Sequence, residues 1–298
     1  MRDKSFVLLD DRGVLRISGP DRAAFLQGII SNDVAKVSAT QAIWAAFLTP
    51  QGKYLHDFFL AEEGEDSLLL DCEAARRADL LKRMKIFKLR AKVDLADASE
   101  SFRVAALFGP AALESLGLPA RSGAATSFGG GIAFADPRLP ELGARAILPR
   151  DSAQESLEQA SFEAAALADY DALRIGLGLP DGSRDMEVEK AILLENGFDE
   201  LGGVDWDKGC YMGQELTART KYRALIKKRL LPVRIDGPTP PPDTPILSNG
   251  REVGRLRSSA KGQALALLRL ESLNGEAPEL VADEAKLSPQ RPAWLRSQ

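Results

Sequence analysis

The residues of this chain with the most evident chemical capacity surround a cysteine at position 210. Cys210 stands between a glycine and a tyrosine, with Lys208 two positions before it and a second glycine three positions after it. A nearby lysine favours the thiolate, the reactive form of cysteine, and glycines allow sharp turns and close approach of another molecule. The alternative is a buried structural cysteine between turn glycines. The polar residues that follow favour a functional loop, because buried segments rarely contain so many; they are Gln214, Glu215, Arg219, Lys221 and Arg223.

The composition is that of an ordinary soluble globular protein. The chain has 298 residues, 45% hydrophobic and 28% charged, which is enough for two or three domains with a substantial core. Its formal net charge is −4, so no strong overall field attracts nucleic acid or an anionic membrane. No apolar run is long enough to span a bilayer. We therefore expect neither nucleic acid nor a membrane as a partner.

The cysteines and the first residues bear on compartment and metal content. Cys72 and Cys210 lie far apart, which is neither a disulfide framework nor a metal-binding motif. Residues 2–4 are charged, and no apolar signal segment follows them. These features predict a cytoplasmic protein without a stably bound metal.

Apolar segments separated by turn residues predict the secondary structure of the first half. The segments 6–9 and 14–17 are predicted to form a hairpin, and 44–48 and 54–60 flank a turn with the sequence Thr-Pro-Gln-Gly. A helix is predicted over 73–87 from the spacing of its apolar residues. Strands and helices mix without regular β-α-β repeats, which favours an α+β fold.

The sequence pattern of the second half predicts a helical part followed by a small barrel. An alanine-rich segment over 153–167 predicts one helix. After it, short apolar segments at 229–235, 253–256 and 264–270 recur at close spacing, a pattern typical of a small β-barrel.

Three single polar residues outside the cysteine loop admit two interpretations each. Glu195 lies among apolar neighbours, and is either exposed or a buried, hydrogen-bonded carboxylate. Asn32 either caps a turn or faces a ligand. His56, the one histidine, is interpreted as a strand residue facing solvent or a polar neighbour, because no ligand cluster accompanies it.

The segment around Cys210 resembles the signature of the YgfZ family of folate-binding proteins. That signature is Lys-Gly-Cys-Tyr-x-Gly-Gln-Glu, and it stands complete at 208–215, with Met212 at the variable position. Four further blocks resemble the same family along nearly the whole chain; they lie at 19–34, 49–53, 174–180 and 253–267.

The resemblance implies the fold of the glycine cleavage T-protein. That is an α+β, three-domain cloverleaf around a central folate channel, ending in a small β-barrel. We expect a folate-binding region at 1–223 and the barrel at 224–298. The folate-binding region is expected to consist of two interleaved subdomains, roughly 1–40 plus 136–223, and 41–135.

The resemblance also implies ligands and residue roles. Tetrahydrofolate or a derivative is the expected cofactor, with Glu195 gripping its pteridine ring, and Cys210 is the expected functional thiol. One cysteine cannot fill the four-thiolate shell of a usual cluster, so no stably bound metal is expected. The residues expected to contact folate are Asn32, Glu195, Lys208, Tyr211, Gln214, Glu215, Arg219 and Arg223.

The function implied is that of an accessory factor for iron–sulfur cluster assembly or repair in a bacterial cytoplasm. Its expected partners are cluster assembly proteins and client enzymes such as radical S-adenosylmethionine enzymes. The alternative is an aminomethyltransferase that uses Asp57 catalytically. T-proteins carry an acidic pair in the matching segment, whereas this chain has His56 and Asp57, which puts that chemistry in doubt. A third reading is an interaction module without folate.

Overall fold

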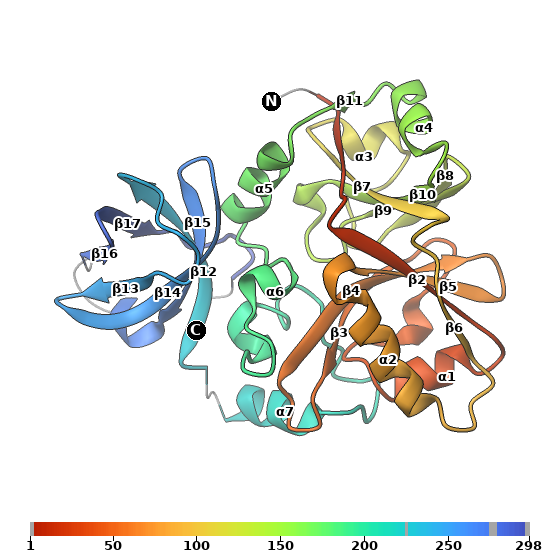
Figure 1. The fold of residues 1–298 in the computed structure, drawn as a ribbon, viewed down its shortest axis with the longest axis horizontal. Helices are drawn as coiled ribbons and strands as arrows, with labels where there is room; N and C mark the ends of the chain where they lie inside the picture. Colours follow the sequence, from red (N-terminus) through yellow and green to blue (C-terminus); the bar gives the residue numbers. More distant parts are fainter. Residues whose placement is uncertain (1–2, 224–225, 274–278, 296–298) are drawn as a thin grey trace.

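The computed structural model describes residues 3–223, 226–273 and 279–295. Two β-sheets lie on one side of the molecule and a β-barrel on the other, with α5 (Leu167–Gly176), α6 (Gly182–Asp185) and α7 (Gln214–Tyr222) between them (Figure 1). This arrangement confirms the expected α+β class with a C-terminal barrel.

The second sheet takes its strands from one continuous stretch of the chain, and the first takes its strands from before and after that stretch. The first has the order β11-β1-β7-β10-β9-β8 and the second β3-β4-β5-β2-β6. The strands of the first sheet are β1 (Ser5–Leu8), β7 (Phe102–Phe108), β8 (Ala125–Phe128), β9 (Gly131–Ala135), β10 (Ala144–Pro149) and β11 (Glu163–Ala164). Those of the second are β2 (Arg12–Ser18), β3 (Ile43–Leu48), β4 (Tyr54–Glu63), β5 (Ser67–Glu73) and β6 (Asp94–Asp97).

The predicted hairpin of 6–9 and 14–17 is wrong. β1 pairs with β7 in the first sheet, whereas β2 pairs with β5 and β6 in the second. Each strand buries consecutive residues on both of its faces, such as Phe6 and Val7 in β1. An isolated two-stranded hairpin cannot supply that burial, so the chain crosses from one sheet to the other.

Sheet membership also departs from the predicted interleaving. Of the strands between 102 and 135, β7 pairs with β1 and β10, β9 pairs with β10, and β8 pairs with β9. None of them pairs with β3 to β5, so the second sheet draws its strands from 12–97. The chain thus enters the second sheet after β1 and returns to the first at β7.

Short helices connect the strands. The predicted single helix over 153–167 is wrong, because α4 ends at Gln159 and β11 intervenes before α5 begins. The remaining helical segments are α1 (Arg22–Gln27), η1 (Val34–Lys36), η2 (Ala74–Arg76), α2 (Arg77–Lys88), α3 (Ala112–Ser115), η3 (Pro140–Leu142), α4 (Ala153–Gln159), η4 (Leu193–Asn196) and η5 (Leu270–Leu273).

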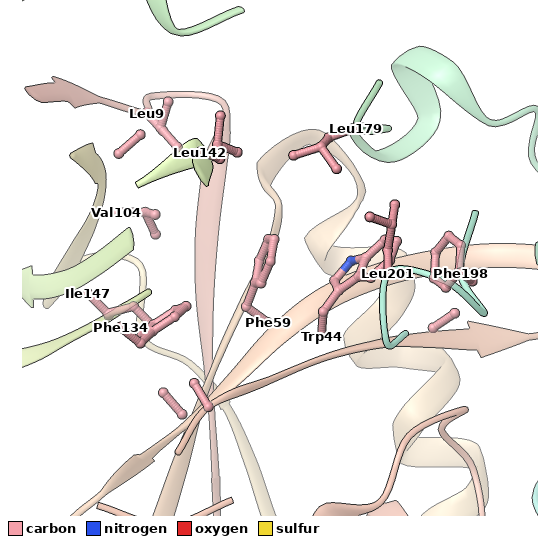
Figure 2. Packing of buried hydrophobic residues seen from close by; sticks show 14 of the residues in the cluster. Leu9, Trp44, Phe59, Val104, Phe134, Leu142, Ile147, Leu179, Phe198 and Leu201 are labelled. Atoms are coloured by element: carbon pink, nitrogen blue, oxygen red, sulfur yellow. The ribbon is translucent and has the colours of Figure 1, made fainter. Parts of the chain in front are cut away.

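The largest apolar cluster lies where the two sheets face each other. Phe59 and Phe134 come from opposite sheets, and Trp44 stacks on Phe198 (Figure 2). The ring centroids of these two pairs are 6.3 Å and 3.9 Å apart. Charged groups join the sheets beside it. The buried carboxylate of Asp71 accepts hydrogen bonds from two arginines, at 2.6 Å from Arg12 and 2.7 Å from Arg145. The full satisfaction of these charges makes their burial tolerable.

The C-terminal barrel is closed and has its own core. Its strands are β12 (Lys228–Asp236), β13 (Pro245–Ser248), β14 (Arg251–Ala260), β15 (Gln263–Arg269), β16 (Leu280–Ala282) and β17 (Ala285–Pro289). Buried polar contacts fix it to the helical layer. Arg174 of α5 donates to Asp185 of α6 at 2.8 Å and to Ser258 of β14 at 2.9 Å. These bonds set the position of β14 relative to the rest of the protein.

Candidate functional site

The loop that carries Cys210 is exposed but firmly held. The Cys210 side chain is free and exposed. On one side of it, Lys208 Nζ donates to three backbone carbonyls of residues 27, 30 and 32, at 2.9, 2.6 and 2.8 Å. On the other side, the Met212 N–H donates to the Gly28 carbonyl at 3.0 Å. The thiol therefore stands at the surface of a loop tied on both sides to the segment after α1.

The Lys208 ammonium group donates all of its N–H bonds to acceptors of the protein itself. An ammonium group has three N–H donors, which matches its three carbonyl acceptors. Burial lowers its pKa to about 8, because the charged form loses hydration. These contacts describe a tether. Its expected role toward the thiolate or a folate tail stays a prediction.

Two glycines allow the loop at 208–215 to pack closely against the Thr-Pro-Gln-Gly turn. A Cβ on Gly213 would lie 2.5 Å from the Thr49 carbonyl oxygen, and one on Gly52 would lie 2.6 Å from the Gly213 oxygen. Both glycines also have positive φ, 81° and 82°. Only glycine fits such a backbone contact, so the turn supports the base of the cysteine loop.

A groove of about 560 Å³ runs beside the cysteine loop along α7. Arg219 is exposed there and pairs with Glu215. Lys221 stacks over Trp206, with its Nζ 3.8 Å from the ring centroid. The groove thus gathers five of the predicted folate contacts. Its lining residues are Asp205, Trp206, Gly209, Tyr211, Gln214, Glu215, Ala218, Arg219, Tyr222 and Arg223.

Glu195 lies in a different cavity, of about 250 Å³, between η4 and the barrel. It is half-buried, and burial raises the pKa of its carboxyl group above the usual range, with Lys228 acting in the opposite direction. Arg229 of β12 donates to the Leu194 carbonyl at 2.6 Å and so positions η4 against the barrel. The cavity is lined by Asp185, Glu187, Lys190, Ala191, Glu195, Asn196, Lys228, Glu252, Val253, Gly254, Arg255, Arg257, Leu267 and Arg269.

Two of the residues that line this cavity each have a buried polar atom without a hydrogen-bond partner among the described residues. These atoms are Asn196 Oδ1 and Arg257 Nε. Neither residue was predicted, because their proximity depends on the packing of η4 against β14. The sequence held one signal, a polar amide directly after Glu195.

Asn32 and Asp57 are buried and fully engaged. The Asn32 amide donates to the carbonyls of Trp44 and Gly202 at 2.7 and 2.8 Å. Asp57 accepts from Trp44 Nε1 at 3.0 Å and from the Tyr54 hydroxyl at 2.8 Å, and burial raises its pKa. Neither residue lines the Glu195 cavity or the α7 groove.

His56, next to Asp57, does not face solvent. It is 3% exposed, its Nε2 lies 2.9 Å from Asp79 Oδ2, and burial lowers its pKa to about 4. The polar neighbour that the sequence suggested is therefore Asp79.

In the part of the chain that the structure describes, no three His, Cys, Asp or Glu side chains gather so as to hold a metal ion. No helix in the described ranges combines the length and apolar character needed to cross a membrane.

Comparison with known proteins shows which fold the chain has. Residues 9–124 match the GCVT N-terminal domain, and 227–297 match the CAF17 C-terminal beta-barrel domain. The structure is similar to the crystal structure of glycine cleavage system aminomethyltransferase T from Bartonella henselae, with a TM-score of 0.78 and 15% identity. That similarity covers 98% of this chain and 86% of the other. At such low identity it establishes the fold alone.

Proteins found by sequence have a higher identity to this chain than that structure has. The chain is 35% identical to the human protein named iron–sulfur cluster assembly factor IBA57, mitochondrial, over 90% of this chain and 78% of the relative. It is 32% identical to the mouse protein of the same name, with the same coverage. A homologue from Coccidioides immitis is also 32% identical, over 95% of this chain and 76% of its own length.

These names contradict the expected bacterial cytoplasm, because all three relatives are named as mitochondrial proteins. The charged start of the chain was not a sound basis for that expectation. The extent and identity of the matches show that the chain belongs to the IBA57 family of iron–sulfur cluster assembly factors.

Proposed function

We propose that this protein assists iron–sulfur cluster assembly or repair in client enzymes, with Cys210 as the functional thiol and tetrahydrofolate as a bound cofactor. The names of the relatives support the cluster role. The partners proposed are cluster assembly proteins and cluster-containing clients, such as radical S-adenosylmethionine enzymes. The protein acts as an accessory factor without turnover of its own.

The observation that carries this proposal is the exposed thiol on a tethered loop. Cys210 is accessible, whereas Cys72 is buried and burial raises its pKa to about 12. A thiolate is the form that ligates iron. One thiolate leaves three positions of a four-thiolate shell to other groups. Cys210 therefore suits a shared, transient ligation in which a partner protein supplies the remaining ligands and receives the cluster.

The Glu195 cavity fits the ring end of a folate. The Glu195 carboxylate suits the N–H groups of a pteridine ring, and Lys228 and Arg255 offer partners for carboxylates. Its volume of about 250 Å³ is below the usual range of about 300–1,000 Å³ for whole ligands. The ring would therefore lie inside and the glutamyl tail outside. Contact of the tail with Arg219 and Arg223 remains part of this proposal.

Aminomethyl transfer finds no comparable support. Asp57 already accepts two hydrogen bonds in a buried site, and its neighbour His56 replaces a second acid. We therefore do not propose it.

The test is complementation of a strain that lacks the gene, scored by cluster content and activity of its cluster-containing enzymes. Wild-type protein should restore both, whereas Cys210→Ala, produced at the same level, should restore neither. Cys72→Ala is the matched control, because it removes the buried thiol. Full complementation by Cys210→Ala would contradict the thiol role.

A further inference from the structure

We propose that the outer face of α2 and the turn that follows it bind the surface of an anionic membrane. Such contact is peripheral, and it requires neither a membrane-spanning helix nor Cys210 nor folate. The expectation that no membrane is a partner rested on the formal net charge of −4. Net charge describes the whole chain and does not exclude a local patch of the opposite sign.

α2 carries apolar side chains on two faces. Its inner face buries Leu80 and Met84 in the apolar cluster of the second sheet. Its outer face is defined by five residues that recur at helical spacing and line one hollow; they are Ala78, Leu81, Lys82, Lys85 and Ile86. Ile86 is 63% exposed. Figure 1 shows α2 in front of the second sheet, with no other element over it. The core therefore does not account for the apolar residues of the outer face.

Leu89, directly after α2, is the most exposed large apolar residue that the structure describes. Its side chain is 88% exposed. The Ala91 N–H donates to the Lys88 carbonyl at 2.8 Å, which closes a turn with Leu89 in its second position, at φ 45° and ψ −110°. That is the position of a type II′ turn where glycine is normally found. A leucine strains the backbone there, so glycine would serve the fold better than the residue present.

Unpaired basic residues accompany these apolar side chains. Lys82, Lys85 and Arg90 are exposed and form no ion pair with any residue that the structure describes. The nearest acidic residues along the chain, Asp79 and Asp94, pair with other basic side chains. The outer face and its turn thus combine protruding aliphatic groups with free positive charge, which complements a negatively charged surface.

Size and composition favour a lipid surface over an acidic protein. Stable protein interfaces engage about 20–30 residues a side and are depleted in lysine, whereas this face is short and two of its three free cations are lysines. Anionic headgroups attract Lys and Arg, and each such residue near the surface raises the affinity about fivefold. Aliphatic side chains such as Ile86 and Leu89 can enter the headgroup boundary, while long lysine stems keep their ammonium groups at the headgroups.

Co-sedimentation of the full-length protein with lipid vesicles tests the proposal. One set of vesicles contains phosphatidylcholine alone, and the other contains equal parts of phosphatidylcholine and phosphatidylglycerol. Wild-type protein should bind the anionic vesicles at least about tenfold more tightly than the neutral ones. Added salt should weaken this binding, because the charges that meet the headgroups are exposed.

Leu89→Gly separates a membrane role from a structural one. Binding to the anionic vesicles should weaken about fivefold or more, because an inserted aliphatic side chain is lost. The midpoint of urea unfolding should stay the same or rise, because glycine relieves the positive φ. Ile86→Gln should weaken binding similarly. Leu167→Gln is the matched control, since it removes another exposed apolar side chain, 42% exposed, and should leave vesicle binding unchanged.

A pair of double variants tests the contribution of charge. Lys82→Gln combined with Lys85→Gln should weaken binding to the anionic vesicles about tenfold or more. Arg234→Gln combined with Lys286→Gln changes the net charge by the same amount. These two residues are exposed on adjacent strands of the barrel. Their replacement should leave binding within about twofold of wild type, because only cations near the lipid surface contribute.

Three results would overturn the proposal. The first is equal affinity of wild-type protein for neutral and anionic vesicles. The second is unchanged binding in Leu89→Gly and Ile86→Gln, or equal losses in the two double variants, since either places the contact elsewhere. The third is no binding to either kind of vesicle, which would leave the outer face of α2 to an acidic protein surface instead.

Discussion

The cysteine loop and the Glu195 cavity satisfy their polar groups in opposite ways. Beside Cys210 the Lys208 ammonium group is paired with three carbonyls of the protein, and the thiol lies at the surface. In the wall of the cavity Asn196 and Arg257 are buried, yet Asn196 Oδ1 and Arg257 Nε lack partners among the described residues. Completed hydrogen bonds fix a reactive atom in position, whereas unfinished ones leave binding energy for a ligand.

Because of this difference, we expect substitutions in the two regions to change different properties of the protein. Changes beneath the cysteine loop should act on folding stability, because they break contacts that the free protein already makes. Changes in the cavity should act on ligand affinity, because their contacts form only on binding. The two regions are lined by different residues, so their effects should be separable.

The largest expected effect is that of Gly213→Ala. The new Cβ would lie 2.5 Å from the Thr49 carbonyl oxygen at a positive φ of 81°. We expect the free energy of unfolding to fall by about 3 kcal/mol, from strain and displaced backbone together. Urea unfolding followed by circular dichroism measures it.

Gly209→Ala is the control for backbone strain alone. Gly209 has a φ of 87°, yet a Cβ there meets no atom within 4 Å. The expected loss is about 1 kcal/mol. Equal losses for the two variants would show that the contact between the cysteine loop and the Thr-Pro-Gln-Gly turn carries no stability.

Lys208→Met should cause the next largest loss in the free energy of unfolding. It keeps the apolar stem but removes the donors to three carbonyls, and we expect a loss of about 2 kcal/mol in the free energy of unfolding. Lys82→Met, on an exposed face of α2, should change it by less than about 0.5 kcal/mol. A Lys208→Met protein as stable as wild type would refute the tether.

The pH dependence of folate affinity probes the cavity. Burial raises the pKa of Glu195, so this group takes up a proton at a higher pH than an ordinary glutamate as the solution is acidified. The ionised form is the acceptor for the pteridine N–H groups. The affinity for 5-formyltetrahydrofolate, measured by calorimetry, should therefore fall several-fold with falling pH. In Glu195→Gln the affinity should be weaker and nearly independent of pH, and a parallel pH dependence in both proteins would remove Glu195 from the site.

The smallest stability effect is expected for Arg219→Gln. Arg219 and its partner Glu215 are exposed in the α7 groove, where an ion pair contributes little. The free energy of unfolding should change by less than about 0.5 kcal/mol. A loss comparable to that of Lys208→Met would mean that the groove belongs to the structural support of the loop.

Local patterns in the sequence predicted where strands and helices lie better than they predicted which strands pair with each other. The barrel strands and the α2 segment follow from periodicity and spacing, and the motif at 208–215 indicated the family. The turn after β1 looked like a hairpin because its residues suit a turn, but both flanking strands bury two faces and so require partners far along the chain. Partner choice depends on tertiary packing, which turn residues do not encode.

The candidate site shows the same limit. Glu195 and Cys210 were grouped by the family resemblance, yet they belong to different surfaces of the molecule, one facing the barrel and one beside α7. Arg257 escaped notice because an arginine in a barrel strand ordinarily faces solvent. Its burial is caused by the docking of β14 against α5 and α6.

The most direct test of two separable sites is calorimetric titration of 5-formyltetrahydrofolate into Cys210→Ala and Glu195→Ala. Separation of the two sites predicts that Cys210→Ala binds with wild-type affinity and that Glu195→Ala binds at least about tenfold more weakly. Loss of binding in Cys210→Ala, or wild-type binding in Glu195→Ala, would contradict it.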